Sequence, residues 1–241
     1  MKSVYHQNES RGLADHGWLK SRHTFSFAAY HNQERMSFGL LRVLNDDIVK
    51  PSMGFGTHPH DNMEIVSIPL SGSLRHQDSM GNTHIISAGE VQIMSAGSGI
   101  THSEYNNSSS DGVAFLQIWV LPKEKNITPR YDQKILDVAK RKNRFQILVA
   151  PNVSEESVWI NQDAWFSLAD IEAEQKVHYE KNNINNGVYF FVIEGDANIG
   201  GHDVKQRDGL GIIDGETYIV FAQAKTQLLA IEVPLMNQVK P

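Results

Sequence analysis

The feature that most limits the fold is the alternation of short apolar runs with turn residues. Segments such as 113–122 (VAFLQIWVLP), 187–201 and 226–234 are rich in β-branched and aromatic residues, and Gly, Asn or Asp separates them from the next run. Runs of this length and composition are typical of strands in a sandwich or barrel. Residues 131–143 are compatible with a helix or a polar connector. The sequence therefore predicts an all-β fold in which helix is the minority element.

The strand pattern occurs twice along the chain. In the first half an apolar run ends at Gly72, and a second Gly turn at Gly89 leads into the next run; in the second half the corresponding glycines are Gly195 and Gly209. A turn at residues 81–82 (Gly-Asn) joins two strand-like runs in the first copy, as in a β-hairpin. Repetition of one supersecondary unit indicates two copies of one β-barrel.

Composition excludes several classes of protein. The net charge is −6, from 22 basic and 28 acidic residues, and no run of basic residues is present, so we expect no nucleic-acid partner. The absence of cysteine excludes disulfides, thiolate metal sites and cysteine nucleophiles. The N-terminal residues lack an apolar signal region, and no apolar run is long enough to cross a membrane. We therefore expect a cytoplasmic protein without membrane association, and the oligomeric state, a monomer included, stays open.

Two histidine-containing pairs carry the chemistry of the sequence. His58 and His60 lie two residues apart in GTHPHDNME, and His102 and Glu104 lie two apart in GITHSEYN. Side chains at positions i and i+2 of a strand point to the same face, so two neighbouring strands would bring these four groups together. A single His-x-His pair is common and most histidines bind no metal, but the second pair favours a metal site.

The ligand types restrict the metal and its charge. Three imidazole nitrogens and one carboxylate oxygen suit a borderline divalent ion such as Fe, Mn, Ni, Co or Cu, and Zn is compatible. With one carboxylate the site keeps a net charge near +1, which would attract an anionic ligand. The second half has His178 and His202 but no His-x-His pair, so we expect a metal-binding domain over residues 1–130 and a metal-free domain over residues 131–241.

Other polar residues are expected to play secondary roles. Glu64 lies ~13 Å from His60 on a straight strand, so we expect it to orient a ligand histidine rather than to bind the ion. His16 and His23 lie either near the site or on a strand packed against the core, and His76 and His84 are expected on the surface.

Several motifs together resemble the pirin family of bicupin proteins. HPH at 58–60, followed by Glu64, is similar to the first cupin motif, and Gly89, His102 and Asn106 are similar to the second. The pirin-like pattern continues in five segments: RGLADHGWLKSRHTFSF (11–27), GFGTHPH (54–60), HQDSMGN (76–82), IMSAGSGITHSE (93–104) and QIWVLP (117–122). The resemblance is dense in the first half and sparse in the second.

The resemblance implies a fold, a metal and an activity. The fold would be all-β, with two double-stranded β-helix (jelly-roll) barrels. The metal would be a single ion, most often Fe(II), held by His58, His60, His102 and Glu104. The activity would be that of a quercetin 2,3-dioxygenase, which cleaves a flavonol with O2 and releases carbon monoxide. Its partners would be an aromatic small molecule and O2, and Glu104 would be the catalytic base.

Two alternative functions remain compatible with the sequence. Pirins of animal cells are also described as transcriptional co-regulators, so the chain could be a metal- or redox-sensing protein that acts through a protein partner. Another cupin chemistry, such as sugar isomerisation, is also compatible, because a fold does not determine a function. Oxygen uptake with quercetin, compared with a change in partner affinity on oxidation of the metal, separates the first two.

Overall fold

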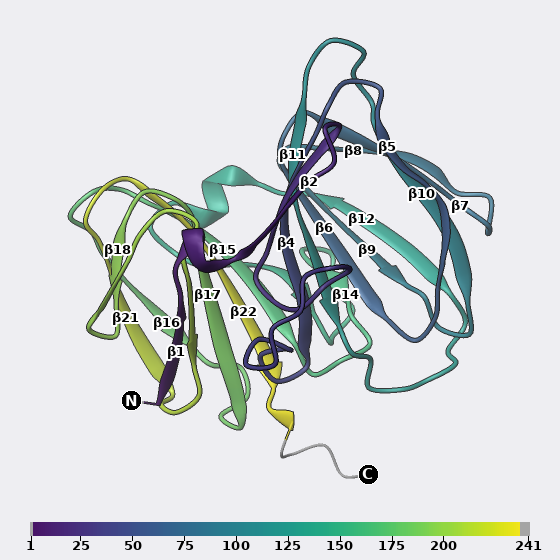
Figure 1. The fold of residues 1–241 in the computed structure, drawn as a ribbon. Helices are drawn as coiled ribbons and strands as arrows, with labels where there is room; N and C mark the ends of the chain where they lie inside the picture. The colour runs from purple at the N-terminus through teal and green to yellow at the C-terminus, as the bar shows by residue number, and fades with distance from the viewer. Residues whose placement is uncertain (1, 237–241) are drawn as a thin grey trace.

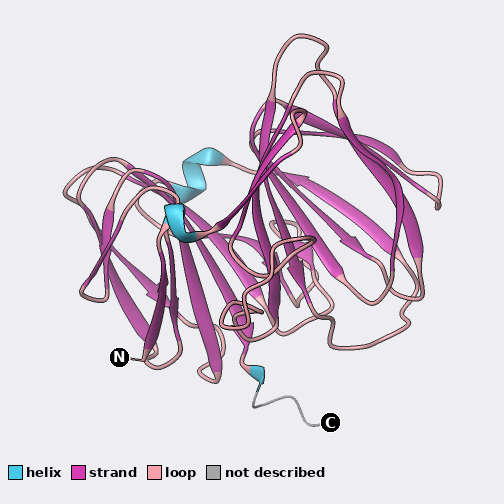
Figure 2. Cartoon of the chain, viewed as in Figure 1, coloured by secondary structure: helices cyan, strands magenta, loops and turns pink. Residues whose placement is uncertain are grey.

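Two β-barrels lie side by side in the computed structural model, which describes residues 2–236 (Figure 1). Each barrel consists of a seven-stranded sheet and a four-stranded sheet. Loops connect nearly all the strands, and helix is confined to short turns (Figure 2). The predicted all-β bicupin fold is confirmed.

The first barrel contains the histidine motifs. Its seven-stranded sheet has the order β12-β9-β6-β11-β4-β3-β2, and its four-stranded sheet has the order β5-β10-β7-β8. The strand bounds are β2 (Gly12–Asp15), β3 (Leu19–His23), β4 (Leu41–Val49), β5 (Gly54–His60), β6 (Glu64–Ser71), β7 (Ser73–Asp78), β8 (Thr83–Ser87), β9 (Glu90–Ser95), β10 (Ile100–Asn106), β11 (Val113–Val120) and β12 (Arg130–Ile135).

The second barrel repeats this arrangement. Its sheets have the orders β1-β20-β17-β22-β15-β13-β14 and β16-β21-β18-β19. The strand bounds are β1 (Ser3–His6), β13 (Gln146–Ala150), β14 (Val158–Trp159), β15 (Trp165–Ile171), β16 (Lys176–Glu180), β17 (Asn186–Glu194), β18 (Ala197–Ile199), β19 (His202–Val204), β20 (Gly209–Ile212), β21 (Thr217–Ala222) and β22 (Thr226–Pro234).

The strand order confirms the predicted duplication. Strands β4 to β11 of the first barrel occupy the same relative places as β15 to β22 of the second. Each barrel also takes an edge strand from the other half of the chain: β1 pairs with β20, and β12 pairs with β9. Figure 1 shows β1, from the N-terminus, in the barrel that the second half of the chain forms. The two halves are therefore linked by paired backbone at both edges.

The segment 131–143 differs from the helix that its sequence allowed. Its first part belongs to β12, and its last part contains the 3-10 helix η2 (Val138–Arg141), which Asp137 caps by accepting a hydrogen bond from the Ala139 N–H. A further 3-10 helix, η1 (Asn8–Ser10), follows β1. β12 forms because six of its residues pair with β9. This pairing depends on tertiary structure, so the local sequence pattern does not predict it.

An apolar layer joins the barrels. It consists of buried residues from both seven-stranded sheets, among them Leu116 and Ile118 of β11 and Phe166 and Phe191 of the second half. Alternation along β11 places these leucine and isoleucine side chains on one face and Phe115 and Gln117 on the other. The sheets therefore pack face to face, and each barrel keeps a separate interior.

The two interiors differ in chemistry. The second is filled mainly by one apolar cluster that includes Tyr179, Phe190 and Tyr218, and its buried Glu232 accepts a hydrogen bond from the Tyr179 hydroxyl. The first has two smaller apolar clusters, and between them a row of buried polar residues crosses the large sheet by direct strand pairing: His23, Asn45, Gln117, Ser67 and Gln92. The barrel that carries the histidine motifs is the one with a polar interior.

None of the helices within residues 2–236 has the length and apolar character that crossing a bilayer requires.

Phe166 tests the apolar layer between the barrels. The side chain is fully buried there, so Phe166→Ala should destabilise the protein by about 3–5 kcal/mol through lost burial and the resulting cavity. The measurement is urea unfolding followed by intrinsic fluorescence. Ile135→Ala is the control, since Ile135 is 82% exposed, and it should change the unfolding free energy by less than about 0.5 kcal/mol. Equal effects of the two substitutions would contradict the shared layer.

Candidate metal centre

Strands β5 and β10 position the two predicted pairs. They are antiparallel neighbours, and His58 lies directly opposite His102. The register then shifts, so that Glu104 lies opposite Phe55. Such irregularities are frequent next to active sites because they redirect side chains. The prediction that the two motifs lie on neighbouring strands is confirmed.

The three histidines meet at one point. The ring centroids of His58 and His102 are 4.5 Å apart, those of His58 and His60 are 4.8 Å apart, and those of His60 and His102 are 4.9 Å apart. One ring nitrogen from each lies within 4.8 Å of the other two. This arrangement has the dimensions of a three-imidazole metal site.

The hydrogen bonds of these rings leave nitrogen lone pairs for a ligand. The Nδ1 of His58 lies 2.7 Å from the carbonyl oxygen of Gly56. Because a carbonyl only accepts, Nδ1 carries the proton and Nε2 keeps its lone pair, the usual orientation of a metal-ligating histidine. Both ring nitrogens of His102 are buried and have no partner among the described residues. These free nitrogens fit a divalent cation.

The rings are electrically suited to a cation. Burial, followed by the neighbouring His102 and His58, lowers the pKa of His60 to about 4. Burial, followed by the neighbouring His58 and His76, lowers the pKa of His102 to about 3. Both rings are therefore neutral near pH 7, and neutral imidazole is the form that binds metal.

Glu104 lies beside the three-histidine cluster rather than within it. Its carboxylate groups with His76 and His102, with ligand atoms within 4.8 Å of one another, and is 1% exposed. The Gln117 amide donates to Oε2 at 2.7 Å and the Ser67 hydroxyl donates to Oε1 at 3.2 Å. The polar row of the large sheet thus holds this carboxylate at the edge of the site.

The expectation for His76 was wrong, whereas His84 is exposed as expected. His76 is fully buried, and its Nε2 lies 3.1 Å from the Asp78 carboxylate. Its ring packs on Tyr131, against whose ring His84 also stacks. Leu74, His76 and Asp78 alternate with exposed or partly exposed residues on β7, so the strand period is the signal that could have placed His76 in the interior.

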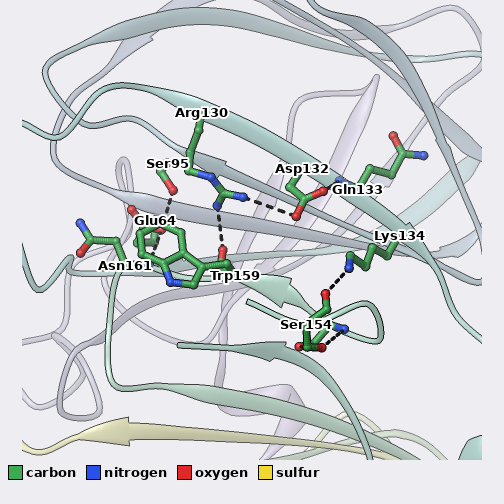
Figure 3. A network of polar contacts seen from close by, with 10 residues as sticks. Glu64, Ser95, Arg130, Asp132, Gln133, Lys134, Ser154, Trp159 and Asn161 are labelled. Atoms are coloured by element: carbon green, nitrogen blue, oxygen red, sulfur yellow. Dashed lines mark hydrogen bonds and ion pairs between the residues drawn. The ribbon is translucent and has the colours of Figure 1, made fainter. Parts of the chain in front are cut away.

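The expectation for Glu64 was also wrong, because within residues 2–236 its carboxylate forms no hydrogen bond with a histidine. Its Oε2 accepts hydrogen bonds from the Ser95 hydroxyl (2.8 Å) and the Asn161 N–H (3.1 Å), as Figure 3 shows. On β6, Glu64 has the parity of Val66 and Ile68, which face the other barrel. The turn after His60 ends the strand, so the alternation of faces along β5 does not continue to Glu64. Glu64 instead connects the first barrel to the second half of the chain through its hydrogen bond with Asn161.

Arg130 lies next to this junction. Its guanidinium donates to the Trp159 carbonyl oxygen at 2.8 Å and lies 4.9 Å from the centre of the Trp159 ring (Figure 3). It also forms a partly exposed ion pair with Asp132. These contacts hold β14 against the edge strand β12, so the polar junction supports the architecture rather than the site.

A cavity of about 220 Å³ opens on the histidine cluster. Part of its wall is apolar, from Leu19, Phe27, Phe55 and Trp119, and part is polar, from β3, β4 and the site itself. His23 lines it, which confirms a near-site position for that residue, whereas His16 is exposed on a turn. Burial, opposed by the neighbouring Ser21 hydroxyl and reinforced by repulsion from Asp46 and Glu104, raises the pKa of Asp47 in the wall to about 7.

Comparison with known proteins identifies the family. Residues 5–120 match the family described as Pirin, and residues 147–233 match the Quercetinase C-terminal cupin domain. A relative named quercetin 2,3-dioxygenase, from Escherichia coli K12, is 42% identical over 228 residues, which are 93% of this chain and 95% of the relative. The chain belongs to the pirin family.

Solved pirin structures have the same fold. YhhW from Escherichia coli superposes with a TM-score of 0.92 at 38% identity, covering 97% of this chain and 98% of the other. YhhW in complex with nickel(II) superposes with a TM-score of 0.90 at 37% identity, covering 97% and 100%. These relatives, with the histidine cluster, support a divalent metal site and dioxygenase-type chemistry in this pirin-family chain.

Removal of one imidazole tests the metal centre. Nickel-loaded wild type should retain about one ion per chain after gel filtration, and His102→Ala should retain almost none because two imidazoles remain. Glu104→Gln should weaken binding by about 10–100-fold. Elemental analysis and chelator competition give these values. His84→Ala, an exposed histidine, is the control, and full occupancy in His102→Ala would contradict the site.

The pH dependence of stability tests Glu64. Burial, which outweighs its hydrogen bonds, raises the pKa of Glu64 above the unfolded value of 4.5, so its stabilising contribution is present at low pH and decreases as pH rises. Glu64→Gln keeps one acceptor oxygen and cannot ionise. The unfolding free energy of the variant relative to wild type should therefore increase from about pH 5 to about pH 8. Denaturant titrations at both values measure it, and a difference that stays constant or decreases would contradict the assignment.

Proposed function

We propose that the chain is a metal-dependent dioxygenase that cleaves a quercetin-type flavonol with O2 and releases carbon monoxide. The observation that carries the proposal is the cluster of three imidazoles open to a cavity with aromatic walls. The similarity to proteins named quercetin 2,3-dioxygenase supports the substrate class.

The residues that would hold the metal are His58, His60, His102 and Glu104. Fe(II) is the proposed native ion, and the nickel(II) complex of the relative YhhW supports a site for a divalent metal. When bound, the ion supplies Lewis acidity and a route for electron density between an organic anion and O2. The protein supplies the geometry through β5 and β10.

Charge and proton transfer are the tasks of the side chains. One carboxylate beside a divalent ion leaves a charge near +1, which favours the deprotonated 3-hydroxyl of a flavonol over its neutral form. Glu104 is the proposed base for that proton. The bonds from Gln117 and Ser67 hold its carboxylate in a defined direction, as a general base requires.

The cavity walls complete the proposed site. Phe27 and Phe55 are flat, apolar surfaces that suit a planar ring, and Trp119 packs edge-on against His60 with ring centroids 5.0 Å apart. Apolar walls exclude water and so strengthen the electrostatic interactions inside. The walls would therefore orient an aromatic substrate and exclude water from its deprotonated 3-hydroxyl group.

We assign the metal to the first barrel and a structural role to the second. Where β5 and β10 pair His58 with His102, the corresponding strands β16 and β21 pair Val177 with Val220 and Tyr179 with Tyr218. These side chains are buried in the apolar interior of the second barrel. The second interior stabilises the pair of barrels, and the first is available for chemistry.

Oxygen uptake tests the proposed reaction. Metal-loaded wild type should consume O2 and release carbon monoxide on addition of quercetin, measured with an oxygen electrode and a carbon monoxide probe. His58→Ala and His102→Ala should lose both signals, and Glu104→Gln should lower kcat by about 10²–10⁴-fold through loss of the base.

His84→Ala is the matched control and should retain the wild-type rate, because His84 lies on the exposed side of Tyr131. Full metal content and full activity in both single alanine variants of the cluster would contradict the mechanism. A metal-loaded wild type that consumes no O2 would contradict the dioxygenase and favour the regulatory alternative.

A further inference from the structure

One part of the cavity wall carries polar side chains with no task in the metal site. Ser21 and His23 come from β3, and Asn45 and Asp47 come from β4. The two strands pair so that Ser21 lies opposite Asp47 and His23 lies opposite Asn45. Since each pair of residues is two apart on its strand, the four side chains form a single patch facing the barrel interior.

The patch is buried and its hydrogen bonding is incomplete. Each of the four residues is only 2–4% exposed. His23 Nδ1 and Asn45 Oδ1 have no hydrogen-bond partner among the described residues, and the Ser21 hydroxyl faces the Asp47 carboxyl across the strand pair, where it lowers the pKa of that carboxyl without forming a well-aligned hydrogen bond. A buried polar atom left unpaired is costly, and proteins pair almost all of them. The four residues line the cavity beside the histidine cluster, so a ligand that enters it can supply hydrogen-bond partners for this patch.

The fold itself does not require polar residues at this place. Strand β15 is the counterpart of β4 in the second barrel, and it directs Ser167, Ala169 and Ile171 into an interior that is mostly apolar. The buried carboxylate of that interior, Glu232, accepts hydrogen bonds at both of its oxygens. The patch on β3 and β4 differs in carrying a His, an Asn and an Asp together, on the wall that the cavity shares with His58 and His60.

The donor and acceptor types indicate what the cavity takes. Asn45 Oδ1 only accepts, the Asp47 carboxyl accepts when ionised and also donates when protonated, and the unpartnered Nε1–H of Trp119 only donates. A hydroxyl group donates and accepts, so it satisfies both kinds of atom. Phe27 and Phe55 line the same space. At about 220 Å³ the cavity is below the ~300–1,000 Å³ typical for whole drug-sized ligands, so it takes one ring system.

We propose that Ser21, His23, Asn45 and Asp47 bind a hydroxyl-bearing outer ring of the substrate. The chain therefore selects polyhydroxylated flavonols over a flavonol whose only hydroxyl is the one at the metal. This inference rests on the proposed function, since that function places a flavonol at the histidine cluster. The patch acts as a specificity-determining wall and not as part of the metal's ligand set.

Binding without turnover tests the proposal. Nickel-loaded protein is titrated under anaerobic conditions, by flavonol absorbance, with quercetin and with 3-hydroxyflavone, which lacks hydroxyls on both outer rings. Wild type should bind quercetin at least tenfold more tightly. Asn45→Ala and Asp47→Ala, which open space rather than fill it, should weaken quercetin binding by about tenfold and change 3-hydroxyflavone binding by less than about threefold.

Two further variants keep the result interpretable. Asp47→Asn preserves the shape of the side chain, so it should fold normally and still lower the preference for quercetin because an NH2 group, which only donates, replaces one carboxyl oxygen. Gln92→Ala is the matched control: Gln92 is fully buried in the same barrel with unpartnered amide atoms, but it does not line the cavity. It should leave both dissociation constants unchanged.

The outcomes separate this inference from the dioxygenase itself. Equal losses for both flavonols, no loss for either, or no binding of either would overturn the selective wall. Selective binding without O2 uptake in the aerobic assay would support the wall and contradict the dioxygenase. Oxygen uptake at equal efficiency with both flavonols would support the dioxygenase and overturn the wall.

Discussion

The pairing of β5 with β10 is the constraint on which the site depends. It sets His58 opposite His102, and the spacing of two residues then brings His60 to the same face. A slip of one residue would turn these side chains to the other face of the strand, so the register is also the condition for metal binding. The bonds that hold Glu104 and orient the His58 ring add detail to a geometry that backbone pairing has already established.

That register is supported by the apolar layer between the barrels. The layer buries one face of each seven-stranded sheet, and the exchanged edge strands β1 and β12 connect the two halves by backbone hydrogen bonds. The second barrel adds an apolar interior of its own. Most of the stabilising apolar contacts therefore lie outside the first interior. That interior can then hold buried polar and ionisable side chains, which would destabilise an ordinary apolar core.

The cost of the site is visible in the first interior. Buried histidines, Glu104, Asp47 and Asn45 occupy the first interior, whereas the second is mostly apolar, and several of their polar atoms lack partners among the described residues. Functional sites commonly sacrifice stability in this way. A cation and a hydroxylated ligand would satisfy many of these atoms together, so ligand binding and stability should be linked in this chain.

The sequence by itself determined the strands, the duplication and the three-histidine cluster, because strand period and i, i+2 spacing are local properties that survive folding. Tertiary structure alone decided the rest. Glu64 turned toward the other barrel because a turn interrupts the strand period, and residues 130–135 became a strand because β9 had an open edge. The polar wall of Ser21 and Asp47 also became visible only in three dimensions, since it is formed by the pairing of β3 with β4, which lie in the other sheet of the barrel from the histidine motifs.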